Sequence, residues 1–303
     1  MIRSTLGQFA RRLLCLTCAV ALLGIVATAA DPPSPSIFAK NNLAAWCIVP
    51  FDASRRGPVE RAEMLKKLGI TKLAYDWRDE HVPTFEEEIL ALQKQGIEFF
   101  AYWCPLGDSP ANRAMMGLIE KYHLHPQIWT IAPPAEAESQ EKRVEVNAQA
   151  MVPLVKEAQR LGCQLALYNH GGWSGEPENM IAMVQWLRQH TGTDSVGIVY
   201  NFHHGHEHLA QFPAAFKKML PYLTCVNLNG MTIGGEKILP VGQGQEDQRV
   251  LEMIRDSGYR GPIGILGHRE QVDAEKALQE NLAGLKKLLP AVGEVEAAKT
   301  YGP

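Results

Sequence analysis

Eight short apolar runs, each followed by a segment with helical periodicity, constrain the fold of this chain more than any other feature. The apolar runs lie at 44–50, 72–77, 98–104, 127–132, 164–169, 196–202, 223–229 and 262–267. The segments with apolar residues three and four positions apart lie near 59–68, 84–95, 110–121, 140–161, 178–190, 207–220, 246–257 and 273–288. Near-continuous apolar strands are typical of parallel sheets covered by helices. The pattern therefore predicts an α/β fold built from successive strand–helix units.

Eight such units in about 250 residues predict a single (β/α)8 barrel over residues 41–290. A doubly wound open sheet is the main alternative, because alternation of strands and helices does not by itself show closure. No G-x-G-x-x-G follows the first run and no Walker A motif occurs, which weighs against the nucleotide-binding open sheets. Gly69, Gly96, Gly162 and Gly258 directly follow helical segments and are expected to adopt left-handed backbone conformations there.

The N-terminal segment has the layout of a secretory signal peptide over residues 1–30. Arg11 and Arg12 precede an apolar stretch at 13–26, and Ala27-Thr28-Ala29 is a small-x-small cleavage site. The apolar stretch is too short for a comfortable membrane span, so stable membrane insertion is not expected after cleavage. An exported protein, periplasmic or extracellular, is predicted. The paired arginines also leave twin-arginine export open, although ordinary leaders often contain them.

Two further segments are expected to lie outside the barrel. Residues 31–40 begin Asp-Pro-Pro-Ser-Pro-Ser and predict an extended linker. Residues 291–303 are small and charged and predict a flexible tail. The first forty residues and the last thirteen are therefore left out of the predicted fold.

Charge and cysteine content exclude several classes of protein. The formal net charge is −3 and becomes more negative when a leader containing three arginines is removed, so no nucleic-acid partner is expected. The cysteines outside the leader are widely spaced and include no C-x-x-C, which argues against a zinc knot or a redox motif. They are Cys47, Cys104, Cys163 and Cys225. Three of them lie in apolar runs and predict buried thiols, and the spacing leaves a disulfide open.

Polar side chains directly follow four apolar runs in the C-terminal half. They are Asn169, His170, Asn201, His203, His204, Asn227, Asn229 and His268. Parallel strands of a barrel deliver such groups to one end, so these should form one site. His170 and His204 are the predicted acid/base pair, because imidazole titrates near neutral pH. The amides suit the hydroxyls of a polyol. His206 and His208 are expected on the next helical turn, exposed or capping.

The N-terminal half adds candidates at the ends of its own runs. Asp76 follows the second run and is the best carboxylate helper. Tyr102 and Trp103 end the third run, where aromatic rings suit a carbohydrate site. Trp173 follows Gly171-Gly172, and its ring offers an apolar face for a sugar. Together these residues predict a small carbohydrate as ligand.

With these clusters the sequence resembles the xylose isomerase-like TIM barrels, a superfamily of sugar isomerases, sugar-phosphate isomerase/epimerases and endonuclease IV-type enzymes. The resemblance is sharpest over 162–267 and implies a TIM barrel. In the family's epimerases, a glutamate, an aspartate, a histidine and a second glutamate hold one divalent metal. In this chain those positions hold Tyr168, Asn201, Asn227 and Gly267. The family's accompanying histidines are matched by His170 and His204.

The replaced residues change the chemistry that the resemblance implies. Two amides, a phenol and a glycine give a hard dication almost no charge compensation, so Mg²⁺ or Mn²⁺ is not expected at the family position. A transition metal held by His170, His204 and His268 stays open.

The favoured hypothesis is an exported sugar isomerase, epimerase or related lyase that acts on a sugar or keto-sugar through histidine proton transfer. A catalytically silent, carbohydrate-binding barrel is the main alternative, supported by the missing ligands. A glycoside hydrolase would need two carboxylates flanking the bond, and the strand ends supply acids on one side only. An endonuclease is disfavoured, because its metal cluster is absent from the sequence and the chain is acidic.

Overall fold

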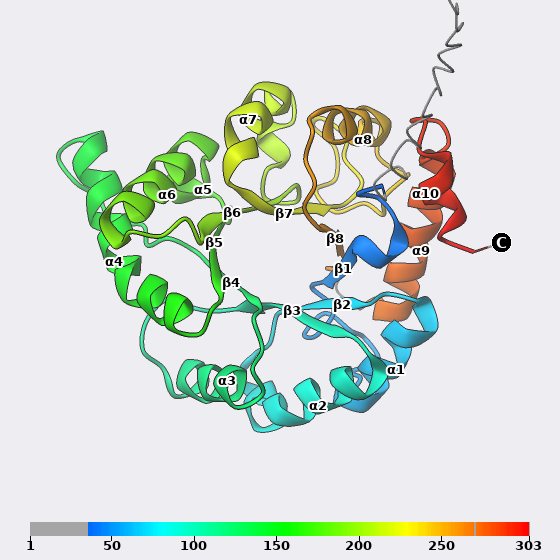
Figure 1. Cartoon of the computed structure of the whole chain (residues 1–303). Helices are drawn as coiled ribbons and strands as arrows, with labels where there is room; N and C mark the ends of the chain where they lie inside the picture. The colour runs from blue at the N-terminus through cyan, green and yellow to red at the C-terminus, as the bar shows by residue number, and fades with distance from the viewer. Residues whose placement is uncertain (1–35, 270, 303) are drawn as a thin grey trace, which may run out of the picture. The chain divides into compact units, whose positions relative to one another are not determined.

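The computed structural model describes residues 36–269 and 271–302, which form a closed barrel of eight parallel strands (Figure 1). Each strand pairs with the next along the chain, and β8 returns to pair with β1. The predicted (β/α)8 barrel is confirmed, and the open-sheet alternative is wrong. The predicted signal peptide and residues 31–35 of the predicted linker lie outside the described residues.

The strands and helices occur close to their predicted positions. The strands are β1 (Leu43–Trp46), β2 (Lys72–Tyr75), β3 (Glu98–Trp103), β4 (Gln127–Thr130), β5 (Gln164–Tyr168), β6 (Val196–Asn201), β7 (Leu223–Leu228) and β8 (Ile263–Leu266). The helices are α1 (Pro58–Leu68), α2 (Phe85–Gln95), α3 (Pro110–Lys121), α4 (Gln140–Arg160), α5 (Gly172–Gly175), α6 (Pro177–Thr191), α7 (Phe212–Met219), α8 (Asp247–Asp256), α9 (Ala274–Leu288) and α10 (Val295–Lys299).

Local signals explain where several helices begin and end. Ser109, Ser139 and Asp273 each precede a helix and accept a hydrogen bond from its first turn. The four predicted left-handed glycines are confirmed, with φ angles of 70°, 68°, 68° and 82° at Gly69, Gly96, Gly162 and Gly258. The helix predicted at 207–220 instead begins at Phe212, where Pro213 suits a first helical turn.

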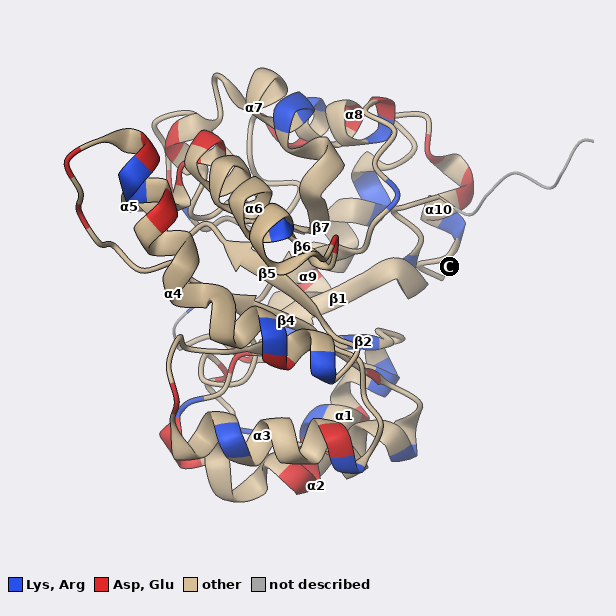
Figure 2. Cartoon of the chain, turned by 60° about the vertical axis from the view of Figure 1, so that its left-hand side comes forward, with Lys and Arg blue, Asp and Glu red and all other residues tan. Residues whose placement is uncertain are grey.

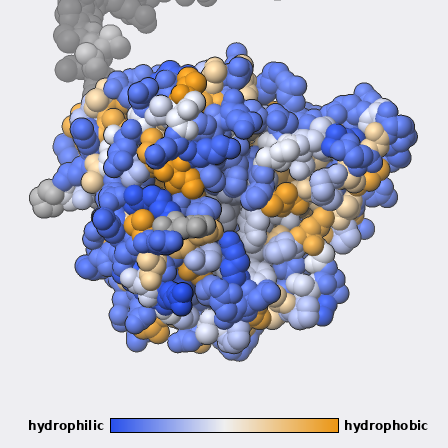
Figure 3. Space-filling view, turned by 180° about the vertical axis from the view of Figure 1, so that it is seen from behind, coloured by the Kyte–Doolittle hydropathy of each residue, from blue (hydrophilic) through white to orange (hydrophobic). Residues whose placement is uncertain are grey.

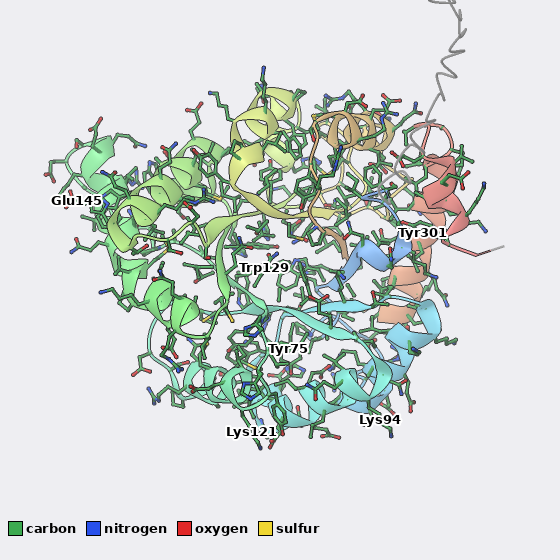
Figure 4. All side chains as sticks on the ribbon, viewed as in Figure 1. Tyr75, Lys94, Lys121, Trp129, Glu145 and Tyr301 are labelled. Atoms are coloured by element: carbon green, nitrogen blue, oxygen red, sulfur yellow. The ribbon has the colours of Figure 1, made fainter. Side chains whose placement is uncertain are left out.

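Apolar side chains fill both the barrel interior and the layer between strands and helices. The interior cluster combines small residues such as Ala44, Ala74 and Ala166 with the large rings of Trp46 and Trp129. Trp129 lies at the centre of the ring of strands in Figure 4. Because side chains alternate along a strand, the other face of each strand packs against the helices. The barrel is therefore a packed core whose open end supports the loops above it.

Both ends of the described chain differ from the sequence prediction. Phe38 is fully buried, so residues 36–40 pack against the barrel and are not a free linker. Residues 295–299 form α10 beside α9, where the sequence predicted a flexible tail (Figure 1). The Tyr301 hydroxyl donates to the Phe38 carbonyl at 2.8 Å and joins the two ends. The sequence prediction gave more weight to the prolines and charged residues of these two segments than to their few apolar residues.

The outer surface is polar and mixed in charge. In Figure 2 the charged residues lie mainly on helices and loops, and the strands are largely free of them. Figure 3 shows a mostly hydrophilic face with hydrophobic residues in separate small groups. None of the helices in the described ranges combines the length and apolar character needed to span a bilayer. The four cysteines of the described part are buried, free thiols, which confirms the predicted burial of Cys47, Cys104 and Cys225.

Phe38 provides a test of the packed N-terminal segment. Phe38→Ala should lower the free energy of unfolding by about 3–5 kcal/mol, because it removes a fully buried ring. Urea denaturation followed by circular dichroism measures this change. Val59→Ala, at a side chain that is 46% exposed, is the matched control and should cost less than about 0.5 kcal/mol. Equal stability of Phe38→Ala and the native protein would mean that residues 36–40 are a linker after all.

Candidate active site

A cavity of about 110 Å³ opens at the C-terminal ends of the strands. It is lined by Trp46, Cys47, Phe51, Asp76, Arg78, Trp103, Tyr168, His170, His204 and His268. These residues come from the ends of β1, β2, β3, β5, β6 and β8 and the loops that follow them. The His203 ring adjoins the group, with its centroid 4.5 Å from that of His204 and 5.6 Å from that of His268. The strand ends thus converge on one site, as their polar clusters predicted.

The floor of the cavity is an aromatic cluster tied together by hydrogen bonds. The Tyr168 hydroxyl accepts a hydrogen bond from Trp46 Nε1 at 3.1 Å and another from Asn201 Nδ2. The Trp46 ring lies 4.9 Å from Trp129 and 6.0 Å from Trp103 between centroids. Burial raises the pKa of Tyr168 well above its ordinary value, so the phenol is neutral. The floor presents rings and a neutral phenol, and no charge.

Asparagine side chains hold the strand ends beside this floor. Asn169 pairs with the main chain of Asn201 on the next strand, donating to its carbonyl at 3.0 Å and accepting from its N–H at 2.7 Å. Asn201 Oδ1 accepts from the His203 N–H at 3.0 Å. The Asn227 side chain lies over Gly264, where an added Cβ would come within 1.8 Å of Asn227 Oδ1. Asn169 and Asn201 thus fix the backbone below the cavity, and none of the three amides lines it.

Asp76 is the one carboxylate among the described residues that line the cavity. Its side chain is 2% exposed, and Oδ1 accepts from the Val49 N–H at 3.3 Å. Oδ2 is buried and has no hydrogen-bond partner within the described residues. Burial raises the pKa of Asp76 to about 6, against the opposing effect of the Arg78 guanidinium. Above that pH the site holds a poorly solvated carboxylate, which is a strong proton acceptor.

The histidines form a compact group above the floor. The ring centroids of His170 and His204 are 4.3 Å apart, and the His268 ring stacks on Phe51 at 3.6 Å. Burial, followed by repulsion from neighbouring imidazoles, lowers the pKa of His204 to about 3 and that of His268 to about 4. Burial also lowers the pKa values of His170 and His203. At neutral pH these rings are neutral and can each donate one N–H hydrogen bond.

Two aromatic residues predicted to bind substrate lie elsewhere. Tyr102 is fully buried on the outer side of the strands and donates to Asn112 Oδ1 at 3.1 Å. Trp173 donates from Nε1 to Gln140 Oε1 at 3.0 Å, and the Arg143 guanidinium lies 4.4 Å from its ring. Both positions match packing roles. Tyr102 takes the outer face of β3, which the sequence did not show because strand residues alternate between two faces, and Trp173 lies in α5.

Asn229 and the histidines at 206 and 208 also lie outside the cavity lining. Asn229 Nδ2 donates to the Lys237 carbonyl at 3.0 Å and organises the loop after β7. His206, expected to be exposed, is 8% exposed and lies in a 3₁₀ turn at 206–208. His208 Nε2 lies 3.0 Å from a Glu176 carboxylate oxygen. Predicted site residues that line the cavity are therefore Asp76, Trp103, His170, His204 and His268, with His203 adjacent.

Sequence reasoning gave no site role to Cys47, Phe51 or Arg78. Cys47 directly follows β1 with a φ of 57°, a left-handed conformation that is rare for a residue with a side chain. Phe51 lies in the loop after β1, and Arg78 follows β2 by three positions. Loops after barrel strands build the site in this fold, so proximity to the first two strands was the available signal.

The residues at the family's metal positions do not fit a divalent ion. The Tyr168 hydroxyl and the Asn201 amide already bond to each other, to Trp46 and to the His203 N–H. Gly267 has no side chain. Among residues 36–269 and 271–302, no group of three or more His, Cys, Asp or Glu side chains is arranged to hold a metal. Hard cations need several oxygen donors with negative charge, and this floor supplies none.

Comparisons with known proteins agree with the barrel. The family model described as xylose isomerase-like TIM barrel matches residues 111–288. Three similar solved structures are 3-keto-D-glucoside 4-epimerase from E. coli, the IolI protein with a bound zinc atom, and D-psicose 3-epimerase from Clostridium cellulolyticum. Their TM-scores are 0.58, 0.60 and 0.56, with identities of 16%, 14% and 13%. Each covers 82% of this chain, and the matches span 100%, 98% and 99% of the respective known chains.

Identities this low show a shared fold. No curated protein sequence matches this chain.

The buried Asp76 carboxyl makes a prediction for stability. Its pKa of about 6 exceeds the ordinary 3.8, so the folded state binds this proton more tightly than the unfolded state. Stability from this group is therefore present at low pH and is lost between about pH 4 and pH 6. Asp76→Asn should be more stable than the native protein above pH 6, by up to about 3 kcal/mol, and the difference should vanish near pH 3.

Urea denaturation at pH 3, 5, 6 and 8 measures this difference. The exposed Asp194→Asn is the matched control and should change stability by less than about 0.5 kcal/mol. A pH-independent difference for Asp76→Asn would contradict a raised pKa.

Proposed function

The chain belongs to the xylose isomerase-like TIM barrel family, and on that premise we propose that it is a sugar isomerase or epimerase. One observation carries this proposal: a single cavity at the strand ends brings the Asp76 carboxyl together with neutral imidazoles. Such a pairing suits removal and return of a proton at a carbon next to a carbonyl. The names of two similar structures, a 3-keto-D-glucoside 4-epimerase and a D-psicose 3-epimerase, support a carbohydrate substrate.

Asp76 is the proposed base. A general base works best when its pKa lies near the working pH, and the pKa of about 6 for Asp76 meets this condition. Asp76 lines the cavity, and its Oδ2 makes no hydrogen bond with another described residue. The sequence favoured His170 and His204 as the acid/base pair, but a pKa of about 3 makes His204 a weak base. The low pKa of His204 therefore supports the Asp76 carboxyl as base in preference to His204.

His204 and His170 are proposed to act on the substrate carbonyl oxygen. A neutral imidazole N–H can hydrogen-bond to the oxygen that gains negative charge as the proton leaves carbon. The adjacent rings, with centroids 4.3 Å apart, allow one to stabilise this oxygen while the other exchanges a proton with it. His170 is the more exposed of the two and can renew its proton from solvent. This mechanism requires no carboxylate-bound metal.

The cavity also limits what binds. Trp46, Trp103 and Phe51 supply apolar faces of the kind that pack against sugar carbons. A volume of about 110 Å³ is small next to ordinary ligand pockets and suits one end of a monosaccharide. Export to the periplasm or outside is also proposed, from the leader-like residues 1–30. Phosphorylated sugars are then less expected, because they are mainly intracellular metabolites.

A carbohydrate-binding barrel without activity is the second candidate. The floor of Tyr168, Asn201 and Trp46, which replaces the family's metal ligands, favours it. The buried Asp76 carboxylate, whose Oδ2 has no hydrogen-bond partner among the described residues, counts against it, because a binding site gains nothing from that desolvation cost. The two candidates differ in whether a carbon-bound proton exchanges with solvent.

Solvent deuterium exchange tests the proposed function. The protein, dialysed against EDTA, should incorporate deuterium beside the carbonyl in at least one member of a panel of sugars and keto-sugars in D₂O, as read by mass spectrometry. Asp76→Asn should slow exchange by about 100-fold or more, and the native rate should rise with pH through about 6 as Asp76 ionises. His204→Gln should slow it by about tenfold or more.

Lys218→Gln, on the exposed face of α7, is the matched control and should exchange at the native rate. Sugar binding without exchange in the native protein would favour the binding barrel. Exchange that is lost on dialysis and restored by Mn²⁺ would contradict proton transfer by Asp76 and the imidazoles without a metal.

A further inference from the structure

The exposed charge at the rim of the cavity is positive. Among the described residues that line it, Arg78 is the one permanent cation and Asp76 the one acid. Asp76 is 2% exposed and lies deep, whereas Arg78 is exposed. The outer part of the cavity therefore combines a guanidinium with the N–H groups of neutral imidazoles.

Arg78 is held in place by one edge of its guanidinium. Its Nη1 donates to the main-chain carbonyls of Asp76 and Trp77, both at 2.8 Å. The guanidinium carbon lies 5.5 Å from the centre of the Phe51 ring, which in turn stacks on His268. Nε and Nη2 make no hydrogen bond with another described residue. A fixed guanidinium with donors left over is well suited to bind a planar anion through two parallel hydrogen bonds.

Arg78 also has no acidic partner within the described part of the chain. Arg56, by contrast, lies 2.9 Å from carboxylate oxygens of both Asp52 and Asp273. Arg61 is paired with Glu88 in the core. Arg56 and Arg61 are thus both neutralised by carboxylates, and Arg78 is not.

The imidazoles beside Arg78 also lack a neighbouring carboxylate that would favour their charged form. The charges that act on His203, His204 and His268 are Lys237, Arg78 and other imidazoles. Lys237 itself lies 3.8 Å from the exposed Glu207 carboxylate. Among the described residues, the cavity lining beside Arg78 thus combines hydrogen-bond donors with one cation, and its one carboxylate, Asp76, is buried below them.

We propose that the substrate is a sugar acid, a monosaccharide with a carboxylate at one end, and that Arg78 binds this carboxylate at the rim. The inference rests on the proposed function and specifies its substrate class. The substrate's neutral carbons then lie toward Asp76, whose charge would repel the carboxylate from the deeper part of the cavity. A singly charged carboxylate matches one guanidinium, whereas a phosphate dianion is usually bound by several cations.

Paired ligands that differ only in charge test the inference. The probes are D-glucuronate, D-galacturonate and D-gluconate, each compared with its uncharged amide and, for the first, with D-glucose. Trp46 and Trp103 line the cavity, so tryptophan fluorescence titration at low ionic strength reports binding. At least one acid should bind about tenfold or more tightly than its amide, the gain expected from a charged hydrogen-bonded pair. The affinity of D-glucose 6-phosphate should exceed that of D-glucose by a smaller factor.

Variants of Arg78 connect this preference to one side chain. Arg78→Gln should reduce the acid-over-amide preference to about onefold, and Arg78→Lys should retain part of it, because lysine keeps the charge but not the fork. Lys218→Gln removes an exposed positive charge on α7 and should leave the preference unchanged. Amide binding by Arg78→Gln at near-native affinity would show that the site is still folded.

The outcomes separate this inference from the proposed function. If no acid binds better than its amide, or if Arg78→Gln keeps the preference, the inference is wrong. Deuterium exchange into a neutral sugar would leave the isomerase proposal standing in that case. A larger gain for the phosphate ester than for any carboxylate would also overturn the sugar-acid assignment.

Discussion

The hydrogen bonds that Trp46 and Asn201 donate to the Tyr168 hydroxyl join β1, β5 and β6 at the centre of the barrel. The site above depends on this interaction. It uses the Tyr168 hydroxyl and the Asn201 amide nitrogen in hydrogen bonds, and packed rings close the interior around them. The floor that results is rigid and uncharged. Chemistry at this mouth must therefore come from groups placed above it.

An uncharged floor also sets the protonation states above it. Burial and repulsion from neighbouring imidazoles lower the pKa values of His204 and His268, and burial raises the pKa of the Asp76 carboxyl. Both shifts favour the neutral forms. They bring the carboxyl close to working pH as a base and leave the imidazoles as hydrogen-bond donors. Arg78, exposed and fixed by backbone carbonyls, is the charged group that remains available to a ligand.

The sequence predicted the barrel and the positions of its strands, because buried parallel strands and amphipathic helices have distinct periodicities. It also predicted which strand ends meet at one cavity, since strand ends in a barrel share one mouth. It could not tell the inward from the outward face at strand ends, so Tyr102 and Asn169 were included although they pack away from the cavity. The sequence also could not predict which group is the stronger base, because the pKa values of Asp76 and His204 depend on burial that only the fold creates. The burial of Phe38 and the helix α10 were not predicted, because their few apolar residues lie among prolines and charged residues.

The neutrality of the imidazoles at the mouth is the central claim, and a ¹⁵N NMR titration of the histidine rings tests it most directly. Assignment through His204→Gln and His268→Gln would identify the two signals. At pH 5.5 an ordinary imidazole is about nine-tenths protonated. The account predicts that His204 and His268 remain neutral at that pH, with pKa values of about 3 and about 4. Protonation of both rings at pH 5.5 in the folded protein would contradict it.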